Sequence, residues 1–143
     1  MKVDTKYFGE IEIQDEKIVH FEKGLFGFEE YKDYTILFDS DAEGTSMFSW
    51  LQSVTEKGLA FPIVNPFVID ESYNPIVNDE IFKEIDNAKS EDLLVFLLAT
   101  VPANAKDASV NMKAPLVINS MTRNGIQVIV ENDDYEIKHK IIK

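Results

Sequence analysis

Short runs of apolar or alternating residues, each ended by turn residues, follow one another along almost the whole chain of 143 residues. Residues 2–7 and 10–13 alternate between polar and apolar side chains on either side of Gly9, which predicts a hairpin. Further strands are predicted at 18–21, 34–38, 46–51, 59–64, 93–101, 115–119, 126–130 and 135–142. Many short strands in series are typical of an antiparallel barrel or sandwich.

Helical patterns are scarce. Residues 78–85 form the clearest one, because Asn78 can cap a helix whose first turn carries acids and whose other face is apolar. Residues 28–34 are compatible with one further turn, whereas Asn65-Pro66 and residues 123–125 have the composition of turns. We therefore predict a mainly β fold: a small antiparallel β-barrel-like single domain over residues 1–143, with one or two short helices.

The charge and composition of the chain exclude several function classes. With 26 acidic against 14 basic residues, a net charge of -12 opposes direct binding of nucleic acid. The absence of cysteine excludes thiolate nucleophiles and zinc-thiolate sites. The apolar run at 93–99 is far shorter than the roughly 20 residues of a membrane span, and residues 1–13 lack the pattern of a secretory signal, so we expect a cytoplasmic protein without membrane contact.

No pattern in the sequence predicts a metal, a cofactor or a catalytic group. Residues 39–44 imitate the start of a calcium-binding loop, but the twelfth position is Trp50 instead of a bidentate carboxylate, which favours a solvated acidic turn. The adjacent acid pairs point to opposite faces of a strand, and neither His20 nor His139 has catalytic spacing around it. We therefore expect no enzyme activity, no cofactor and no metal.

Five short motifs occur in a distinctive order: F-x-x-G-x-x-G-F at 21–28, L-Q-S at 51–53, F-x-x-x-N-P at 61–66, A-P-L-V-I-N at 114–119 and G-x-Q-V-I at 125–129. In this order and spacing the chain resembles the flagellar assembly factor FliW family of bacteria, over nearly its whole length. The first motif packs large apolar residues around two glycines, so it is either a buried turn, which is favoured, or a binding loop.

The resemblance implies a small β-barrel-like fold and a non-enzymatic role in which the family binds two proteins in turn. These are flagellin and CsrA, an RNA-binding repressor of flagellin translation. The factor is held by newly made flagellin before export and afterwards binds CsrA, which then releases the flagellin message. Two further hypotheses are a small-molecule-binding barrel with an enclosed apolar cavity, and a hydrolase with facing carboxylates.

Candidate binding residues fall into three groups. The expected apolar anchors of a partner interface are Phe26, Phe28, Phe61, Pro66 and Phe67. The polar residues Gln52, Asn65, Asn119 and Gln127 either satisfy buried backbone groups, which is favoured, or stand at an edge where a partner pairs. The acids Asp39, Asp41 and Glu43 are expected to act electrostatically. The free protein is expected to be a monomer.

The negative charge itself predicts a mechanism for displacing RNA. An acidic chain docked on a basic RNA-binding protein repels phosphate within a Debye length of about 8 Å, without sharing a site with the RNA. The first 72 residues contain 15 acidic and 6 basic side chains. Neutralising acids among them should remove this repulsion. The triple variant Asp39→Asn, Asp41→Asn, Glu43→Gln should weaken RNA displacement from CsrA more than CsrA binding, as measured by filter binding and calorimetry. Equal loss of both would contradict repulsion as the mechanism.

Overall fold

The computed structural model describes residues 1–38 and 48–141, as a series of short strands joined by turns and a few helical turns. In these ranges the strands are β1 (Lys2–Thr5), β2 (Gly9–Glu12), β3 (Ile18–Phe21), β4 (Asp33–Phe38), β5 (Phe48–Ser53), β6 (Ala60–Val64), β7 (Leu93–Thr100), β8 (Ser109–Val110), β9 (Leu116–Asn119), β10 (Asn124–Gln127) and β11 (His139–Lys140). The helices are the single α-helical turn α1 (Pro66–Ile69) and the 3₁₀ helices η1 (Asp15–Lys17), η2 (Asp79–Ile85), η3 (Ser90–Asp92) and η4 (Ala105–Asp107).

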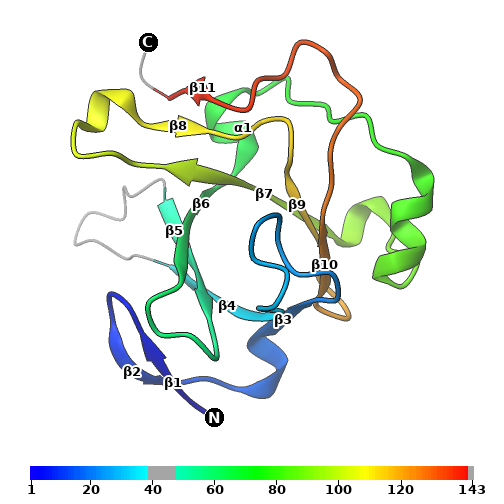
Figure 1. The fold of residues 1–143 in the computed structure, drawn as a ribbon. Helices are drawn as coiled ribbons and strands as arrows, with labels where there is room; N and C mark the ends of the chain where they lie inside the picture. Colours follow the sequence, from blue (N-terminus) through cyan, green and yellow to red (C-terminus); the bar gives the residue numbers. More distant parts are fainter. Residues whose placement is uncertain (39–47, 142–143) are drawn as a thin grey trace.

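Seven strands in the described part of the chain close into a barrel, which Figure 1 shows as a ring. The order around the ring is β7, β6, β5, β4, β3, β10 and β9, and β9 pairs back to β7. Neighbours in the ring are antiparallel except β3 and β10, which run parallel. The β1–β2 hairpin lies beside the barrel. Outside the ring, β8 pairs antiparallel with β7 on one side and with β11 on the other. The predicted mainly β, barrel-like fold is confirmed.

Side chains fill the centre of the barrel. The fully or almost fully buried residues that pack there come from five of the seven ring strands and from one loop: Val19, Phe21, Leu25, Tyr34, Leu51, Ile63, Leu116 and Ile118. The rings of Phe21 and Tyr34 meet edge to face, with 5.7 Å between their centroids. Burial raises the pKa of the Tyr34 hydroxyl to about 12, because the charged form would lose its hydration.

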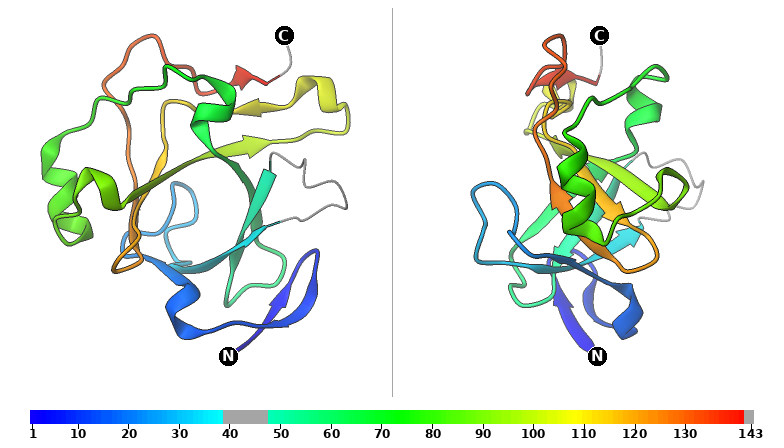
Figure 2. Two further views of the ribbon diagram at one scale, coloured as in Figure 1. Left: turned by 180° about the vertical axis from the view of Figure 1, so that it is seen from behind. Right: turned by 90° about the vertical axis from the view of Figure 1, so that its right-hand side faces the viewer.

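The connection between β3 and β4, residues 22–32, covers one end of the barrel. Leu25 is 1% exposed and inserts into the core, while Gly24 and Gly27 adopt φ values of +66° and +85° that let the chain turn around it. The right-hand view of Figure 2 shows this loop projecting from one side of the barrel. We call this side the capped end and the opposite side, where β6 and β9 finish, the open end. The F-x-x-G-x-x-G-F motif thus builds the cap.

Several elements differ from the sequence predictions. Strand β10 occupies Asn124–Gln127 and not 126–130, and the strand predicted at 135–142 shrinks to His139–Lys140. Asn65-Pro66, predicted as a turn, starts α1, with Asn65 as N-cap and proline in the first turn. The helix predicted at 78–85 is found, but as the 3₁₀ helix η2, and the Asn78 side chain caps it as expected.

None of the helices in the described residues is both long and apolar enough to cross a lipid bilayer.

The conformation of the cap can be tested with a matched pair of glycine variants. A Cβ on Gly24 would lie 2.5 Å from the Glu29 Cα, whereas a Cβ on Gly27 would meet no atom within 4 Å. Gly24→Ala should therefore lower the free energy of unfolding by about 3 kcal/mol, from a left-handed φ plus a backbone clash. Gly27→Ala should lower it by only about 1 kcal/mol, from φ alone. Urea denaturation checks both values, and equal losses would show that the loop is not packed as described.

Candidate protein-binding surfaces

The capped end presents exposed phenylalanines next to acidic side chains. Phe26 is 52% and Phe28 37% exposed, although Phe28 also packs its ring edge to face against Phe61 with centroids 5.1 Å apart. The neighbouring residues Glu22, Glu29 and Glu30 are all exposed. A partly apolar patch bordered by acids is the kind of surface that suits a basic protein partner.

Gln127 fixes this loop to the barrel. Its side-chain oxygen accepts a hydrogen bond from the backbone N–H of Phe26 at 2.8 Å, and its side-chain nitrogen donates to the Ala114 carbonyl at 3.2 Å. The side chain is 7% exposed, so it lies within the fold and serves the backbone of two distant segments. Its position on β10, the strand that closes the ring, makes the cap depend on barrel closure.

Gln52 and Asn119 have comparable contacts inside the fold. The side-chain oxygen of Gln52 accepts from the Lys6 N–H at 2.9 Å and so ties the β1–β2 hairpin to the barrel. Asn119 donates to the Ile85 carbonyl at 2.9 Å, which ties η2 to β9, and its oxygen accepts the N–H of Met121. These contacts with backbone groups are those of the folding role favoured in the sequence analysis. Asn65, in contrast, is exposed and caps α1.

His20 joins two acids at the start of the cap. Its Nδ1 lies 2.7 Å from Asp33 and its Nε2 lies 2.7 Å from Glu22. The hydrogen bond with Asp33, and secondly that with Glu22, raises the pKa of His20, and the same contact lowers the pKa of Glu22. Sequence reasoning missed this cluster, although His20 and Glu22 at spacing i, i+2 share a face of a strand.

The open end carries a groove of about 540 Å³. Residues from four barrel strands, from η1 and from the β9–β10 turn line it: Glu16, Lys17, Val19, Ile36, Phe38, Ser49, Asn65, Leu94, Phe96, Ser120 and Arg123. Phe38 is 71% and Leu94 43% exposed, so the groove opens to solvent and is not an enclosed cavity. This surface could not be recognised from local sequence patterns, because its residues are scattered between Glu16 and Arg123 and barrel closure brings them together.

The predicted binding residues thus lie in two places. Phe26, Phe28 and Phe61 gather at the capped end, whereas Asn65, which lines the groove, and the adjacent α1 lie at the open end. On α1 Phe67 is 53% exposed but Pro66 is buried. Asp39, Asp41 and Glu43 fall outside the described residues.

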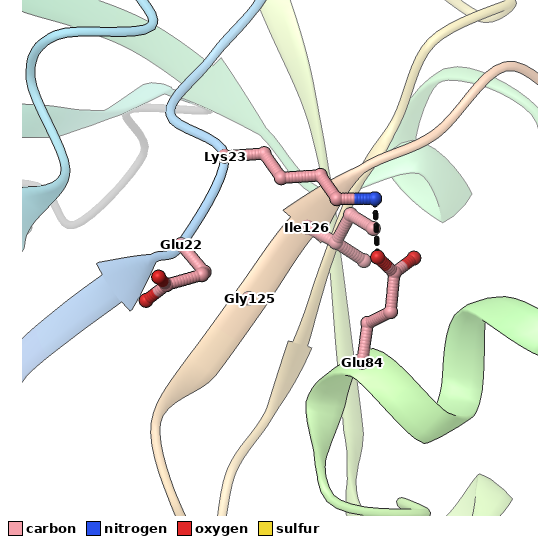
Figure 3. A pocket seen from close by; sticks show the side chains of 5 residues that line it. All are labelled: Glu22, Lys23, Glu84, Gly125 and Ile126. Carbon is pink, nitrogen blue, oxygen red and sulfur yellow. Dashed lines mark ion pairs between the residues drawn. The ribbon is translucent and has the colours of Figure 1, made fainter.

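A small cavity beside the cap has less volume than a typical ligand-binding site. It measures about 180 Å³ and is lined by Glu22, Lys23, Glu84, Gly125 and Ile126, with Lys23 paired to Glu84 across it (Figure 3). Typical sites for small molecules are larger, at about 300 to 1,000 Å³. Within residues 1–38 and 48–141, no three His, Asp or Glu side chains are grouped so that they could hold a metal ion.

Together, the filled barrel, the acidic surface and the exposed aromatic side chains define a small acidic β-barrel protein. A family model described as "FliW protein" matches residues 2–141, and the chain belongs to the FliW family. It is 43% identical over 141 residues to the flagellar assembly factor FliW of Lachnoclostridium phytofermentans, and this alignment covers 99% of this chain and 90% of the relative. It is 39% identical to that of Lachnospira eligens, covering 99% and 94%. The predicted family resemblance is confirmed.

A solved structure supports the same assignment. The crystal structure of a flagellar assembly factor FliW superimposes with a TM-score of 0.89 and 34% sequence identity, covering 100% of this chain and 98% of the other. The match therefore includes both ends of the barrel.

The His20 cluster predicts a pH-dependent contribution to stability. The pKa of His20 is raised above its ordinary value of 6.5, so protonation favours the folded chain. The stabilisation by protonated His20 is complete at pH values below the pKa of His20 in the unfolded chain. It is lost as the pH rises through the higher pKa of His20 in the folded chain. Because His20 and Asp33 are partly exposed, solvent screens their interaction, and His20→Gln should lower the free energy of unfolding by less than about 1 kcal/mol at acidic pH and by much less above the folded pKa.

Urea denaturation at about pH 5.5 and 8.5 measures this difference. Asp33→Asn should reproduce the trend, because Asp33 makes the larger contribution to the shift. If each variant lowers the free energy of unfolding equally at both pH values, the protonated form of His20 does not contribute to stability.

Proposed function

We propose that this chain is a cytoplasmic, non-enzymatic flagellar assembly factor that binds flagellin and the RNA-binding repressor CsrA in turn. Membership of the FliW family carries the proposal, since the relatives named as flagellar assembly factors match the chain from end to end. Bound to newly made flagellin, the protein leaves CsrA on its RNA. Once flagellin is exported, the free protein binds CsrA and opposes repression of flagellin translation.

The chemistry of the capped end favours it as the surface for a basic partner. Phe26 offers an apolar anchor that the partner can desolvate, and the exposed acids Glu22, Glu29 and Glu30 belong to the same loop, against Lys23 and Lys32. Opposite charges accelerate association and fix orientation, an effect that salt weakens. CsrA must be basic where it binds RNA, so the same acids would also repel the RNA phosphates near the interface.

A filled barrel argues against the small-molecule alternative. Core residues such as Leu51, Ile63 and Leu116 are 0% exposed and occupy the axis where a barrel that binds ligands keeps a cavity. The carboxyl groups whose pKa is displaced in the described residues, Glu22 and Asp86, are both shifted downward, whereas a catalytic acid needs a raised pKa. Contacts with other proteins are therefore the function that the surfaces support best.

Titration calorimetry tests the partner switch directly. The purified chain should form a saturable complex with CsrA and, separately, one with flagellin, and added flagellin should weaken the CsrA complex. The CsrA affinity should fall as salt is raised, because screening weakens contacts between the acidic chain and its partner. Absence of heat and of co-elution at tens of micromolar would overturn the proposal.

Two exposed phenylalanines at opposite ends provide a matched pair for this titration. Phe26→Ser removes the anchor at the capped end, and Phe67→Ser removes one of similar exposure on α1. Loss of a central aromatic anchor costs about 2 kcal/mol or more of binding free energy. Phe26→Ser should therefore weaken CsrA binding by about thirtyfold or more. Phe67, also expected from the sequence to be an anchor, lies on α1 at the opposite end, so Phe67→Ser should leave CsrA binding unchanged if the capped end alone binds CsrA.

A further inference from the structure

The groove at the open end differs in chemistry from the acidic surface of the capped end. Its walls are apolar, formed by Val19, Ile36, Phe38, Leu94 and Phe96. At its rim it has two cations, Lys17 and Arg123, against the single acid Glu16. A locally cationic groove in a chain of net charge -12 needs an explanation, because most of this surface repels anions.

Arg123 is the only arginine in the chain and has an unfavourable backbone conformation. Its φ is +65°, in the left-handed region that glycine and asparagine adopt more easily than arginine does. The turn that holds it there is fixed by a hydrogen bond from its N–H to the Asn119 carbonyl at 2.7 Å. Strain at a residue with a distinctive side chain is typical of positions where the side chain has a function.

The cations at the groove lack acidic partners among the described residues. No ion pair of that part of the chain includes Lys17 or Arg123. Among the described residues, the exposed Nη1 of Arg123 makes a long contact of 3.4 Å with the Met121 carbonyl, and the Nε is buried without a hydrogen-bond partner. The exposed end of the guanidinium group is therefore the part that a ligand can reach, and a carboxylate is the acceptor that suits its planar fork best.

We propose that the open-end groove binds a peptide segment of a partner protein in which an acidic side chain stands next to a bulky apolar one. The carboxylate pairs with Arg123 and Lys17, and the apolar side chain packs against Ile36, Leu94 and Phe96. Both halves of the ligand are needed, because the groove supplies an apolar wall beside two cations that lack acidic partners among the described residues. The inference stands on this groove alone and does not depend on the identity of the partners proposed above.

Nuclear magnetic resonance of the isotope-labelled full chain can test this ligand chemistry. The probe is the capped peptide acetyl-Gly-Ser-Phe-Glu-Leu-Ser-Gly-amide, whose only carboxylate is a side chain, and the control replaces its Glu by Gln. The Glu peptide should shift the amides of Ile36 and Phe96 and the Nε–H of Arg123, without shifting that of Phe26. The Gln peptide should bind about tenfold more weakly, since it lacks the charged acceptor. Equal binding of the two peptides, or shifts confined to the capped end, would overturn the proposal.

A variant at Arg123 separates binding from folding. Arg123→Gly suits the positive φ, so it should keep or raise the melting temperature while weakening the Glu peptide about tenfold. Arg123→Lys retains charge but not the planar fork and should bind with intermediate affinity. Unchanged affinity in Arg123→Gly would refute the role of the arginine. Neither result alters the CsrA titration of the wild-type chain, so the two proposals fail independently.

Discussion

Closure of the barrel by β10 is the contact on which the other features of the molecule depend. This short strand pairs in parallel with β3 and antiparallel with β9, and so joins segments about 100 residues apart. The close approach requires Gly125, since a Cβ there would lie 2.8 Å from the Phe21 ring. Without β10, the edges of β3 and β9 would be left unpaired, and Gln127 would no longer hold the cap at Phe26.

The same closure gives the barrel two ends of different character. Because the β3–β4 connection folds back over one end and buries Leu25, that end is sealed and displays the acids and phenylalanines of the loop. At the opposite end, described residues from η1, from the ends of barrel strands and from the β9–β10 turn line the groove. The two ends differ in charge: the cap loop carries Glu22, Glu29 and Glu30 against Lys23 and Lys32, whereas the described residues that line the groove carry Lys17 and Arg123 against Glu16.

Local patterns in the sequence predicted most strands because alternation and turn residues depend only on neighbouring positions. The strand predicted at 115–119 is confirmed to within one residue as β9, although all four of its residues are buried. The strand β10 begins two residues before the predicted position, because Asn124-Gly125 has the composition of a turn but forms the first part of the strand. The signal for α1 was present, since asparagine followed by proline is an N-cap and first turn, but the pair is equally typical of a β-turn. The folding roles of Gln52, Asn119 and Gln127 could be anticipated as a class, but their partners are distant and follow only from the closed ring.

The geometry also bears on how the proposed exchange of two proteins on one chain could work. A shared patch is one solution, but the two ends are joined by a short physical connection: β10 runs from the Arg123 turn at the groove to Gln127, which holds the Phe26 amide at the cap. If a ligand on Arg123 favours one placement of β10 and a partner on the cap favours another, binding at one end opposes binding at the other. Coupling of about 1 to 3 kcal/mol, corresponding to a fivefold to 150-fold change in affinity, is enough for such an exchange. Competition between two proteins for this chain therefore does not require that their footprints overlap; it requires that β10 have two arrangements with different affinities at each end.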